Sequence, residues 1–281
     1  MALDDLRLVI LGSGTSAGIP VIGCGCGVCR SSDPRDRRTR PAACVTFRDP
    51  GGRERVILID TSPDLREQAL RERLKRCDAI VYTHNHVDHT FGLDEVRRFN
   101  ALMGAPIDVY AEASTLQYLK GVYRHIFARE ANVNDSFVAT LIPHAVEPGR
   151  PFDLYGLRWT PLRLLHGRLP ILGYRVEALD DEGCPAQTQP GPLPLAYCTD
   201  VSGVPPEAWR RLTGLTTLIL DMLRYRKHPT HMTVDEAIET ADRIGARRTY
   251  FTHMTHDIRH AELDAGLPET MALAFDGLVI V

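Results

Sequence analysis

The sequence predicts an α/β fold in which helices pack outside one or two β-sheets. Short apolar runs typical of strands recur along the whole chain, and segments that look helical lie between them at regular intervals. Apolar residues make up 44% of the 281 residues, which is enough for a sizeable core. No internal repeat, low-complexity tract or composition break divides the chain, so we expect residues 1–281 to form a single domain.

Strands and helices alternate in the first half of the chain. The apolar run 7–11 ends at a glycine-rich loop, and a Gly51-Gly52 turn joins two apolar runs as in a hairpin. Ser62 followed by Pro63 is typical of the start of a helix. The predicted strands are 7–11, 45–48, 56–60, 79–83 and 107–111, and the predicted helices are 62–73, 93–102 and 114–127.

The second half of the chain is richer in strands. We expect strands over most of residues 138–176, a hairpin tip in the Pro- and Gly-rich residues 180–192, and a strand at 193–198. The rest of the chain alternates again. It shows a strand at 215–221, a helix at 233–244, a strand at 247–253, and then a last helix and strand.

Charge and cysteine content narrow the class of protein. The formal net charge of −3 provides no bulk attraction to nucleic acid or to an anionic membrane. The pattern of residues 1–16 is not that of a secretory leader, and no apolar run approaches the roughly 20 residues of a membrane-spanning helix, so we expect a cytoplasmic protein. Seven cysteines, three of them close together, favour metal ligands over a disulfide framework in such a compartment.

The segment Thr83–His89, THNHVDH, carries the strongest signal of a functional site. It places four potential metal ligands in six positions, directly after the predicted strand 79–83. His84 and His86 project to the same side of an extended backbone, and Asp88 and His89 follow where a helix can begin. We therefore expect this segment to bind two cations, and imidazole with carboxylate suits Zn, Mn or Fe.

This segment resembles the HxHxDH signature of the metallo-β-lactamase superfamily, and further motifs of that family follow in the same order along the chain. Asp60, His166, Asp200 and His253 each come at the end of a predicted strand. The resemblance implies a first metal on His84, His86 and His166. It implies a second metal on Asp88, His89 and His253, with Asp200 as the bridge. We expect Asp60 to orient ligands rather than to bind a metal itself.

A second candidate metal site lies in the turn GCGCGVC. Its small residues allow Cys24, Cys26 and Cys29 to converge on one ion, but three thiolates leave a tetrahedral zinc short of one ligand. His256 is our candidate for the fourth ligand, which would make a closed, structural zinc site. An ordinary turn with incidental cysteines is the alternative.

These features together resemble the PhnP-type branch of the superfamily, whose members are phosphoribosyl cyclic phosphodiesterases. The segments that carry the likeness are LGSGTSAGIPVIGCGCGVC, the basic run DPRDRRTR, THNHVDH and FTHMTH. The resemblance implies a four-layer αββα sandwich, two divalent ions in the active site, one structural zinc and commonly a homodimer. The implied substrate is a small phosphodiester, such as phosphoribosyl 1,2-cyclic phosphate, rather than nucleic acid.

Loop residues are predicted to complete the chemistry. By position His231 matches the histidine that would protonate the leaving alkoxide, with His228 as its rival, and Asp88 is a further catalytic candidate. Arg224, Arg226 and Lys227 form a basic cluster that suits a second phosphate or a solvated loop, and Arg168 is a weaker candidate. The basic residues 30–41 indicate a solvated surface rather than a phosphate-binding patch.

Other functions share parts of this pattern. A tRNase Z-like endonuclease would carry a long arm and a His-Glu-Ala-Thr segment, whereas the insertion at 180–192 is short and His231 is followed by Met232-Thr233. A thioester hydrolase has the same ligands. A non-catalytic zinc protein related to pyrroloquinoline quinone biosynthesis would lack a complete dinuclear set. Metal analysis separates the last class, since the enzyme would bind three metals per chain and the scaffold one.

Overall fold

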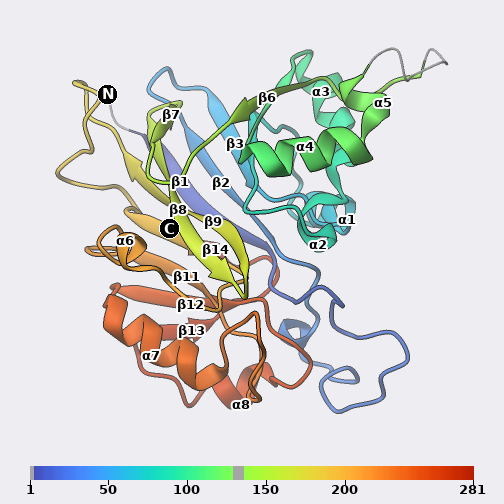
Figure 1. The fold of residues 1–281 in the computed structure, drawn as a ribbon, viewed down its shortest axis with the longest axis vertical. Helices are drawn as coiled ribbons and strands as arrows, with labels where there is room; N and C mark the ends of the chain where they lie inside the picture. The colour runs from blue at the N-terminus through green and yellow to red at the C-terminus, as the bar shows by residue number, and fades with distance from the viewer. Residues whose placement is uncertain (1–2, 129–135) are drawn as a thin grey trace.

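The computed structural model describes residues 3–128 and 136–281, and it arranges them as two seven-stranded sheets packed face to face between helices (Figure 1). In spatial order, the first sheet contains β14 (Val279–Ile280), β1 (Asp4–Gly12), β2 (Ala42–Arg48), β3 (Glu54–Ile59), β4 (Ala79–Val81), β5 (Ile107–Ala111) and β6 (Leu141–Ala145). The second contains β13 (Met271–Leu273), β12 (Arg248–Thr252), β11 (Thr217–Asp221), β10 (Leu195–Cys198), β9 (Leu169–Ala178), β8 (Leu157–His166) and β7 (Phe152–Leu154).

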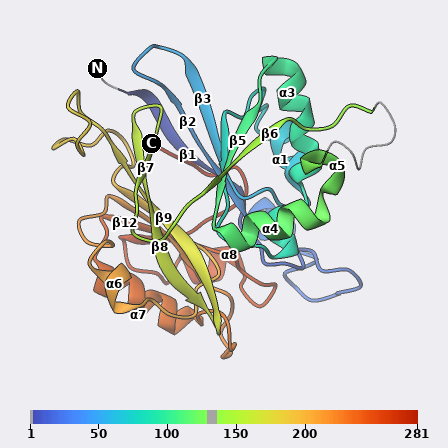
Figure 2. The same cartoon turned by 45° about the horizontal axis from the view of Figure 1, so that its top comes forward.

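Helices cover the outer faces of both sheets, as the two views of the ribbon show (Figure 1, Figure 2). On the first sheet lie α1 (Leu65–Arg71), α2 (Val87–Thr90), α3 (Arg97–Met103), α4 (Ala113–Val122) and α5 (Arg124–Phe127). On the second lie α6 (Pro206–Trp209), α7 (Val234–Ile244) and α8 (His260–Asp264). Two short 3-10 helices, η1 (Pro34–Asp36) and η2 (Leu93–Val96), lie in connections.

Three buried apolar layers hold the four structural layers together. The central layer, between the sheets, includes the large side chains of Trp159, Tyr174 and Tyr197. A second apolar layer packs α6, α7 and α8 onto their sheet, and a third packs the helices of the first half onto theirs. The predicted four-layer αββα sandwich is confirmed.

Each sheet of the sandwich contains four consecutive parallel strands, whose carboxyl ends meet at one edge. β3 to β6 are parallel in the first sheet, and β10 to β13 are parallel in the second. Side chains that follow such strands gather at one edge, which is where α/β folds place their sites. The motif residues after β3, β4, β10 and β12 therefore meet, although they are far apart in sequence.

Several predicted elements differ from the observed ones. The predicted helix 93–102 begins as a 3-10 turn, and the predicted helix 114–127 is interrupted at Tyr123, whose buried hydroxyl donates a hydrogen bond to Thr90 O at 3.0 Å. The apolar run 152–166 is two strands, because Tyr155 and Gly156 make a turn with positive φ angles of 54° and 91°. The hairpin tip at 180–192 is confirmed by antiparallel pairing of β9 and β10.

Two expectations, a single domain and no membrane-spanning segment, concern the whole chain, whereas the structure describes only part of it. The predicted single domain includes residues 1–2 and 129–135, which lie outside the described residues, and it stays a prediction. Within the described part of the chain, every helix is too short or too polar to cross a membrane.

Gly92 offers a test of how tightly the histidine-rich segment is packed. A Cβ at this position would lie 2.0 Å from Ser62 O, so Gly92→Ala must displace backbone. We expect the free energy of unfolding in urea to fall by about 1–3 kcal/mol. Gly121→Ala is the matched control, because a Cβ there has open space in α4 and a helical alanine should be neutral or stabilising. Equal stability of the two variants would contradict the packing described.

Candidate metal centre

The backbone at three strand ends is held in the left-handed region. Asp60, Asp200 and His253 follow β3, β10 and β12 with φ angles of 64°, 60° and 66°. Such a conformation costs roughly 1–3 kcal/mol for a residue with a side chain and persists only where the surroundings enforce it. Here it turns the three side chains toward the shared edge of the sheets.

The THNHVDH segment joins β4 to α2, as its pattern predicts. His84 lies in the extended connection, His86 caps α2, and Asp88 and His89 lie within that helix. Thr90 Oγ1 donates to His86 O at 2.9 Å and fixes the turn. His84, Asp88 and His89 are buried, whereas His86 is exposed.

The predicted ligands converge in groups whose donor atoms all lie within 4.8 Å of one another. The groups are Asp88, His89, Asp200 and His253; then His84, His86 and Asp200; and then His166, Asp200 and His231. Asp200 belongs to all three. The His166 ring lies 5.7 Å from that of His84 and 5.1 Å from that of His86, measured between centroids.

The two oxygens of Asp200 face different histidines. Oδ1 lies 3.1 Å from His89 Nε2 and 3.3 Å from His253 Nε2. Oδ2 lies 3.9 Å from His84 Nε2. One carboxylate thus stands between the two predicted ligand sets, which is the arrangement required of a bridging ligand.

Each of three histidines is anchored through Nδ1, which leaves Nε2 for a metal. Nδ1 of His89 lies 2.7 Å from Asp60 Oδ2, and Nδ1 of His166 lies 2.9 Å from Asp200 O. Nδ1 of His84 lies 3.0 Å from Thr83 Oγ1. The buried Nε2 atoms of His84, His89 and His253 have no hydrogen-bond partner among the described residues, so the donor set fits cations.

Asp60 lies behind the predicted ligands and contacts one of them. Its carboxylate accepts hydrogen bonds from Thr83 N and Thr83 Oγ1, both at 2.8 Å, in addition to its contact with His89. Complete burial raises the pKa of Asp60, and the neighbouring His89 opposes that rise. Its place supports an orienting role rather than direct metal binding.

Positive charge is required inside this cluster. Burial works against ionised Asp200, yet His253 and His89 hold its pKa well below the usual range. Burial likewise works against protonated His89, but Asp200 and Asp88 raise its pKa. The pKa of His253 is raised in the same way, chiefly by Asp200, although burial lowers it. Without a metal, histidine protons therefore balance the buried carboxylates.

The cysteine turn closes on His256. Its Nδ1 lies 3.2, 3.6 and 3.4 Å from the Sγ atoms of Cys24, Cys26 and Cys29. All seven cysteines are free thiols. A backbone hydrogen bond from Cys29 lowers the pKa of Cys26 to about 6, whereas burial raises the pKa of Cys29 to about 11. Three sulfurs and one imidazole at such distances suit a structural zinc, and they join the N-terminal loop to the loop after β12.

The basic run 30–41 is not simply a solvated surface, and for Arg38 that prediction was wrong. Arg38 is 1% exposed and donates hydrogen bonds to Thr255 O and Ile258 O, both at 2.9 Å. Its charge is paired with Asp36 at 3.1 Å. The side chain therefore braces the segment that carries His256. This role could not be predicted from the sequence, because nothing in a basic run distinguishes an arginine that becomes buried from one that stays exposed.

His231 lies in the centre and His228 at its rim. The ring centroid of His231 is 4.6 Å from that of His166 and 4.7 Å from that of His253, and the side chain is buried. Its Nδ1 lies 2.9 Å from Asp221 Oδ1. His228 is half-buried, with its ring 5.2 Å from that of His231 and its Nδ1 3.1 Å from Thr230 Oγ1.

The predicted basic cluster is mostly engaged within its own loop. Arg224 donates to Arg226 O at 3.1 Å and to Lys227 O at 3.2 Å, and Lys227 pairs with Glu236. The side chains of Arg226 and Arg168 are exposed, and in the described part of the chain neither makes a hydrogen bond or ion pair. Of the three predicted cations in the loop, Arg226 is the one whose side chain has no partner in the described ranges 3–128 and 136–281, and it is therefore the one available to a substrate.

Sequence analysis missed Asp221, which ends β11 and is fully buried. A signal was present: LTTLILD ends an apolar strand with aspartate, just as LILID does at Asp60.

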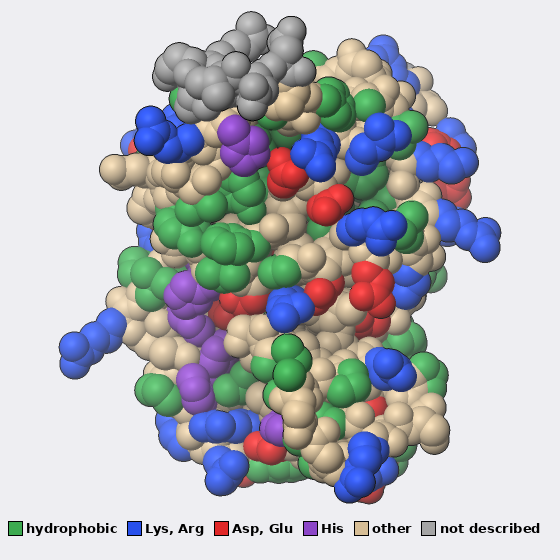
Figure 3. Space-filling view, turned by 90° about the vertical axis from the view of Figure 1, so that its right-hand side faces the viewer, with side chains coloured by type: hydrophobic (Ala, Val, Ile, Leu, Met, Phe, Trp, Pro, Cys, Tyr) green, Lys and Arg blue, Asp and Glu red, His purple; other side chains and the backbone are tan. Residues whose placement is uncertain are grey.

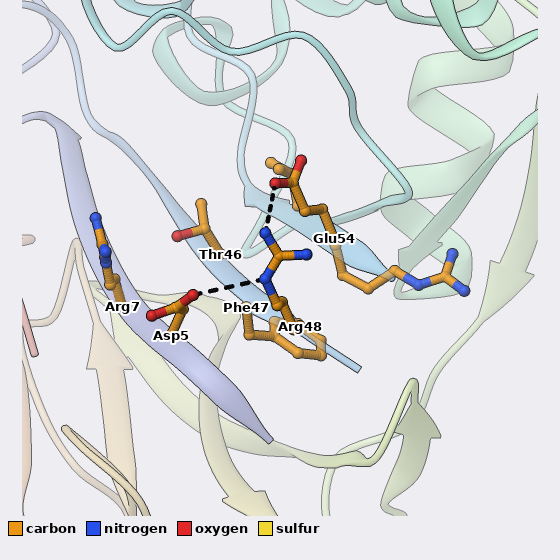
Figure 4. Close-up of a pocket in the computed structure, with 8 residues that line it drawn as sticks. Asp5, Arg7, Thr46, Phe47, Arg48 and Glu54 are labelled. Carbon is orange, nitrogen blue, oxygen red and sulfur yellow. Dashed lines mark hydrogen bonds and ion pairs between the residues drawn. The ribbon is translucent and has the colours of Figure 1, made fainter. Parts of the chain in front are cut away.

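The histidines gather beside acidic side chains on one face of the molecule (Figure 3). A surface pocket on β1 to β3 is lined by ion-paired side chains instead of histidines (Figure 4). There Arg48 pairs with Asp5 at 3.6 Å and with Glu54 at 3.2 Å. The pocket is lined by no histidine or cysteine, so it plays no part in the candidate metal centre.

Known proteins share this sequence and fold. Residues 55–254 match the family model described as a Beta-lactamase superfamily domain. An octanoyltransferase of Porphyromonas gingivalis is 36% identical over 97% of this chain and 51% of its own length, so the chain spans about half of that relative.

Two solved structures are similar over nearly the whole chain. A structure described as a new diphosphatase from the PhnP family is 41% identical, with a TM-score of 0.85 over 99% of this chain and 98% of the other. Zinc-bound PqqB from Methylobacterium extorquens is 21% identical, with a TM-score of 0.72 over 98% and 99%, which shows a shared fold.

Metal content provides a test of the cysteine site. We expect about three metal ions per chain in the loaded protein and about two in Cys24→Ser, because a tetrahedral zinc would lose one of its four ligands. Elemental analysis of dialysed samples measures both values. Cys184→Ser, which changes an exposed cysteine outside the cluster, is the control and should retain about three. An unchanged metal content in Cys24→Ser would refute the assignment.

The raised pKa values of His89 and His253 predict that metal binding releases protons. A proton on an imidazole must leave before the nitrogen can bind a cation. Affinity should therefore tighten as pH rises from 6 toward 8 and weaken as it falls. Titration calorimetry of the metal-free protein at pH 7, in buffers of different ionisation enthalpy, measures the number released. Zero protons released would contradict the electrostatics described.

Proposed function

This chain belongs to the metallo-β-lactamase superfamily and, within it, to the PhnP family, and from this membership we propose that it is a dinuclear-metal-dependent phosphodiesterase. The observation that carries the proposal is the placement of Asp200, whose two oxygens face His84 on one side and His89 with His253 on the other. The substrate class we infer is a small phosphodiester of the cyclic ribose type, such as phosphoribosyl 1,2-cyclic phosphate.

The proposed ligand sets combine the observed groups of donor atoms, since His166 shares Asp200 with the group of His84 and His86 but is not itself a member of that group. His84, His86 and His166 would hold one divalent ion, Zn, Mn or Fe. Asp88, His89 and His253 would hold the other, with Asp200 shared. Two such ions supply Lewis-acid stabilisation of charge on the phosphoryl oxygens and an activated water at neutral pH. Asp88 therefore contributes to catalysis through its ion.

His231 is the proposed proton donor to the leaving oxygen. Its Nδ1 is engaged by Asp221, so Nε2 is the ring nitrogen left for a substrate atom. An alkoxide is a poor leaving group, which makes a positioned acid worth about 10²–10⁴-fold in rate. His228 is the less favoured candidate, because its ring lies farther out and its Nδ1 faces Thr230.

Two exposed arginines without a side-chain partner among the described residues support a substrate with a second, non-reacting phosphate. Arg226 is the member of the basic loop that remains available, and Arg168 on the β8–β9 turn is exposed as well. Gly167 brings that turn against the loop, since a Cβ there would lie 2.8 Å from Thr230 Cγ2. A homodimer and a cytoplasmic location remain part of the proposal.

A diphosphatase is the second candidate, favoured by the 41% identity to a structure so described. In both reactions a nucleophile attacks phosphorus. The leaving group of a diphosphatase is a phosphate, which needs less help from a general acid than an alkoxide does. A panel of substrates with the metal-loaded protein separates them. It contains bis-p-nitrophenyl phosphate, cyclic nucleotides, phosphoribosyl 1,2-cyclic phosphate, a nucleoside diphosphate sugar, pre-tRNA and a thioester. We expect the cyclic ribose phosphate to react fastest, and turnover of the thioester alone would end the proposal.

His231→Ala tests the acid role. We expect turnover of a diester with an alkyl leaving group to fall by about 10²-fold or more, while bis-p-nitrophenyl phosphate, whose leaving group needs no proton, changes little. Metal content should stay the same. His144→Ala is the control, because it changes a half-exposed histidine of β6 that is paired with Asp108 of β5. Loss of metal in His231→Ala would indicate a ligand instead of an acid.

A further inference from the structure

Asp221 is a buried carboxylate that faces the centre, and its ion-pair partners among the described residues are histidines rather than lysine or arginine. It ends β11, and its side chain is fully inaccessible. Its oxygens accept hydrogen bonds from three donors on two different segments. A buried carboxylate is costly unless its hydrogen bonds are made, so the surroundings define the position of this group closely.

The three donors belong to functional parts of the centre. Oδ1 accepts from Asp200 N at 3.1 Å and lies 2.9 Å from His231 Nδ1, and Oδ2 accepts from Met232 N at 3.0 Å. The first of these supports the left-handed backbone of Asp200, whose φ is 60°. One carboxylate oxygen thus fixes the distance between the bridging residue and the proposed proton donor.

The contact with His231 also decides which ring nitrogen is available. A carboxylate only accepts hydrogen bonds, so Nδ1 of His231 must carry the proton in this pair. Nε2 is then the nitrogen left for the site, and the hydrogen bond from Met232 N to Asp221 Oδ2 ties the backbone next to His231 to the same carboxylate. His253 is the other titratable group facing Asp221, with Nδ1 3.8 Å from Oδ1.

We propose that Asp221 is a positioning residue for the leaving-group step: it holds the proton on Nδ1 of His231, so that a second ring proton, on Nε2, points at the departing oxygen and is transferred to it. The proposal deepens the phosphodiesterase assignment and depends on it. Asp221 acts through His231 and does not touch the substrate. A direct metal-ligand role is the competing explanation, because Asp221, His231 and His253 also lie within reach of one another.

Asp221→Asn tests the proposal with the metal-loaded enzyme and two diesters. The amide has the volume of the carboxylate but cannot accept at both atoms. We expect kcat for an alkyl leaving group to fall by about 10²-fold, with KM and metal content unchanged, and kcat for bis-p-nitrophenyl phosphate to change less than about threefold. The double variant with His231→Ala should be no slower than His231→Ala alone, since both changes remove one function.

Asp276→Asn is the matched control. The Asp276 side chain is 8% exposed, accepts hydrogen bonds from Ser13 and Thr39 and pairs with Arg71 at 3.3 Å, and it has no hydrogen bond or ion pair with a histidine among the described residues. Asp276→Asn should lower the free energy of unfolding without changing the ratio of kcat for the alkyl diester to kcat for bis-p-nitrophenyl phosphate. An equal loss on both diesters in Asp221→Asn, a lower metal content or a further loss in the double variant would overturn the proposal.

A readout without turnover separates this proposal from the assigned reaction. Nitrogen-15 NMR of the histidine rings in the zinc-loaded protein reports whether Nδ1 and Nε2 of His231 carry protons, and the Nδ1 proton is present both before and after Nε2 gives up its own. We expect the Nδ1-protonated form in the wild type and its loss in Asp221→Asn. A wild-type spectrum with Nδ1 unprotonated refutes the positioning role. Failure to cleave any diester, with the expected spectrum, refutes the reaction and leaves the placement of His231 intact.

Discussion

The carboxylate of Asp200 is the constraint on which the rest of the centre depends. It is buried at the end of β10, its backbone is left-handed, and its two oxygens face histidines from different parts of the chain. Negative charge in such a place needs compensation, either from protonated imidazoles or from cations. The strands, the anchored Nδ1 atoms and Asp60 behind them all keep nitrogen donors within reach of that one group.

The fold explains why so much of this site can be recognised in the sequence. Asp60, His84, Asp200 and His253 each come just after a strand, and strand ends of parallel sheets meet at one edge. Spacing and residue type therefore indicate both their chemistry and their meeting place. His256 could be proposed in the same way, because three thiolates require a fourth ligand.

The remaining features depend on contacts that no local pattern reveals. Arg38 lies in a run of charges that resembles a solvated surface, yet it is buried against backbone carbonyls that belong to the far end of the chain. The sequence shows that Arg224 and Lys227 are basic. It does not show that their side chains are already engaged with Arg226 O and Glu236. The role of Asp221 can be inferred only from its contacts with Asp200 and His231, which lie far from each other in the sequence.

Anomalous diffraction from crystals of the metal-loaded protein tests the central claim most directly. We predict two peaks at the sheet edge, each with an oxygen of Asp200 in its coordination shell, and a third peak inside the cysteine turn. A single ion at the edge, or two ions with the Asp200 side chain turned away from either one, would contradict the account.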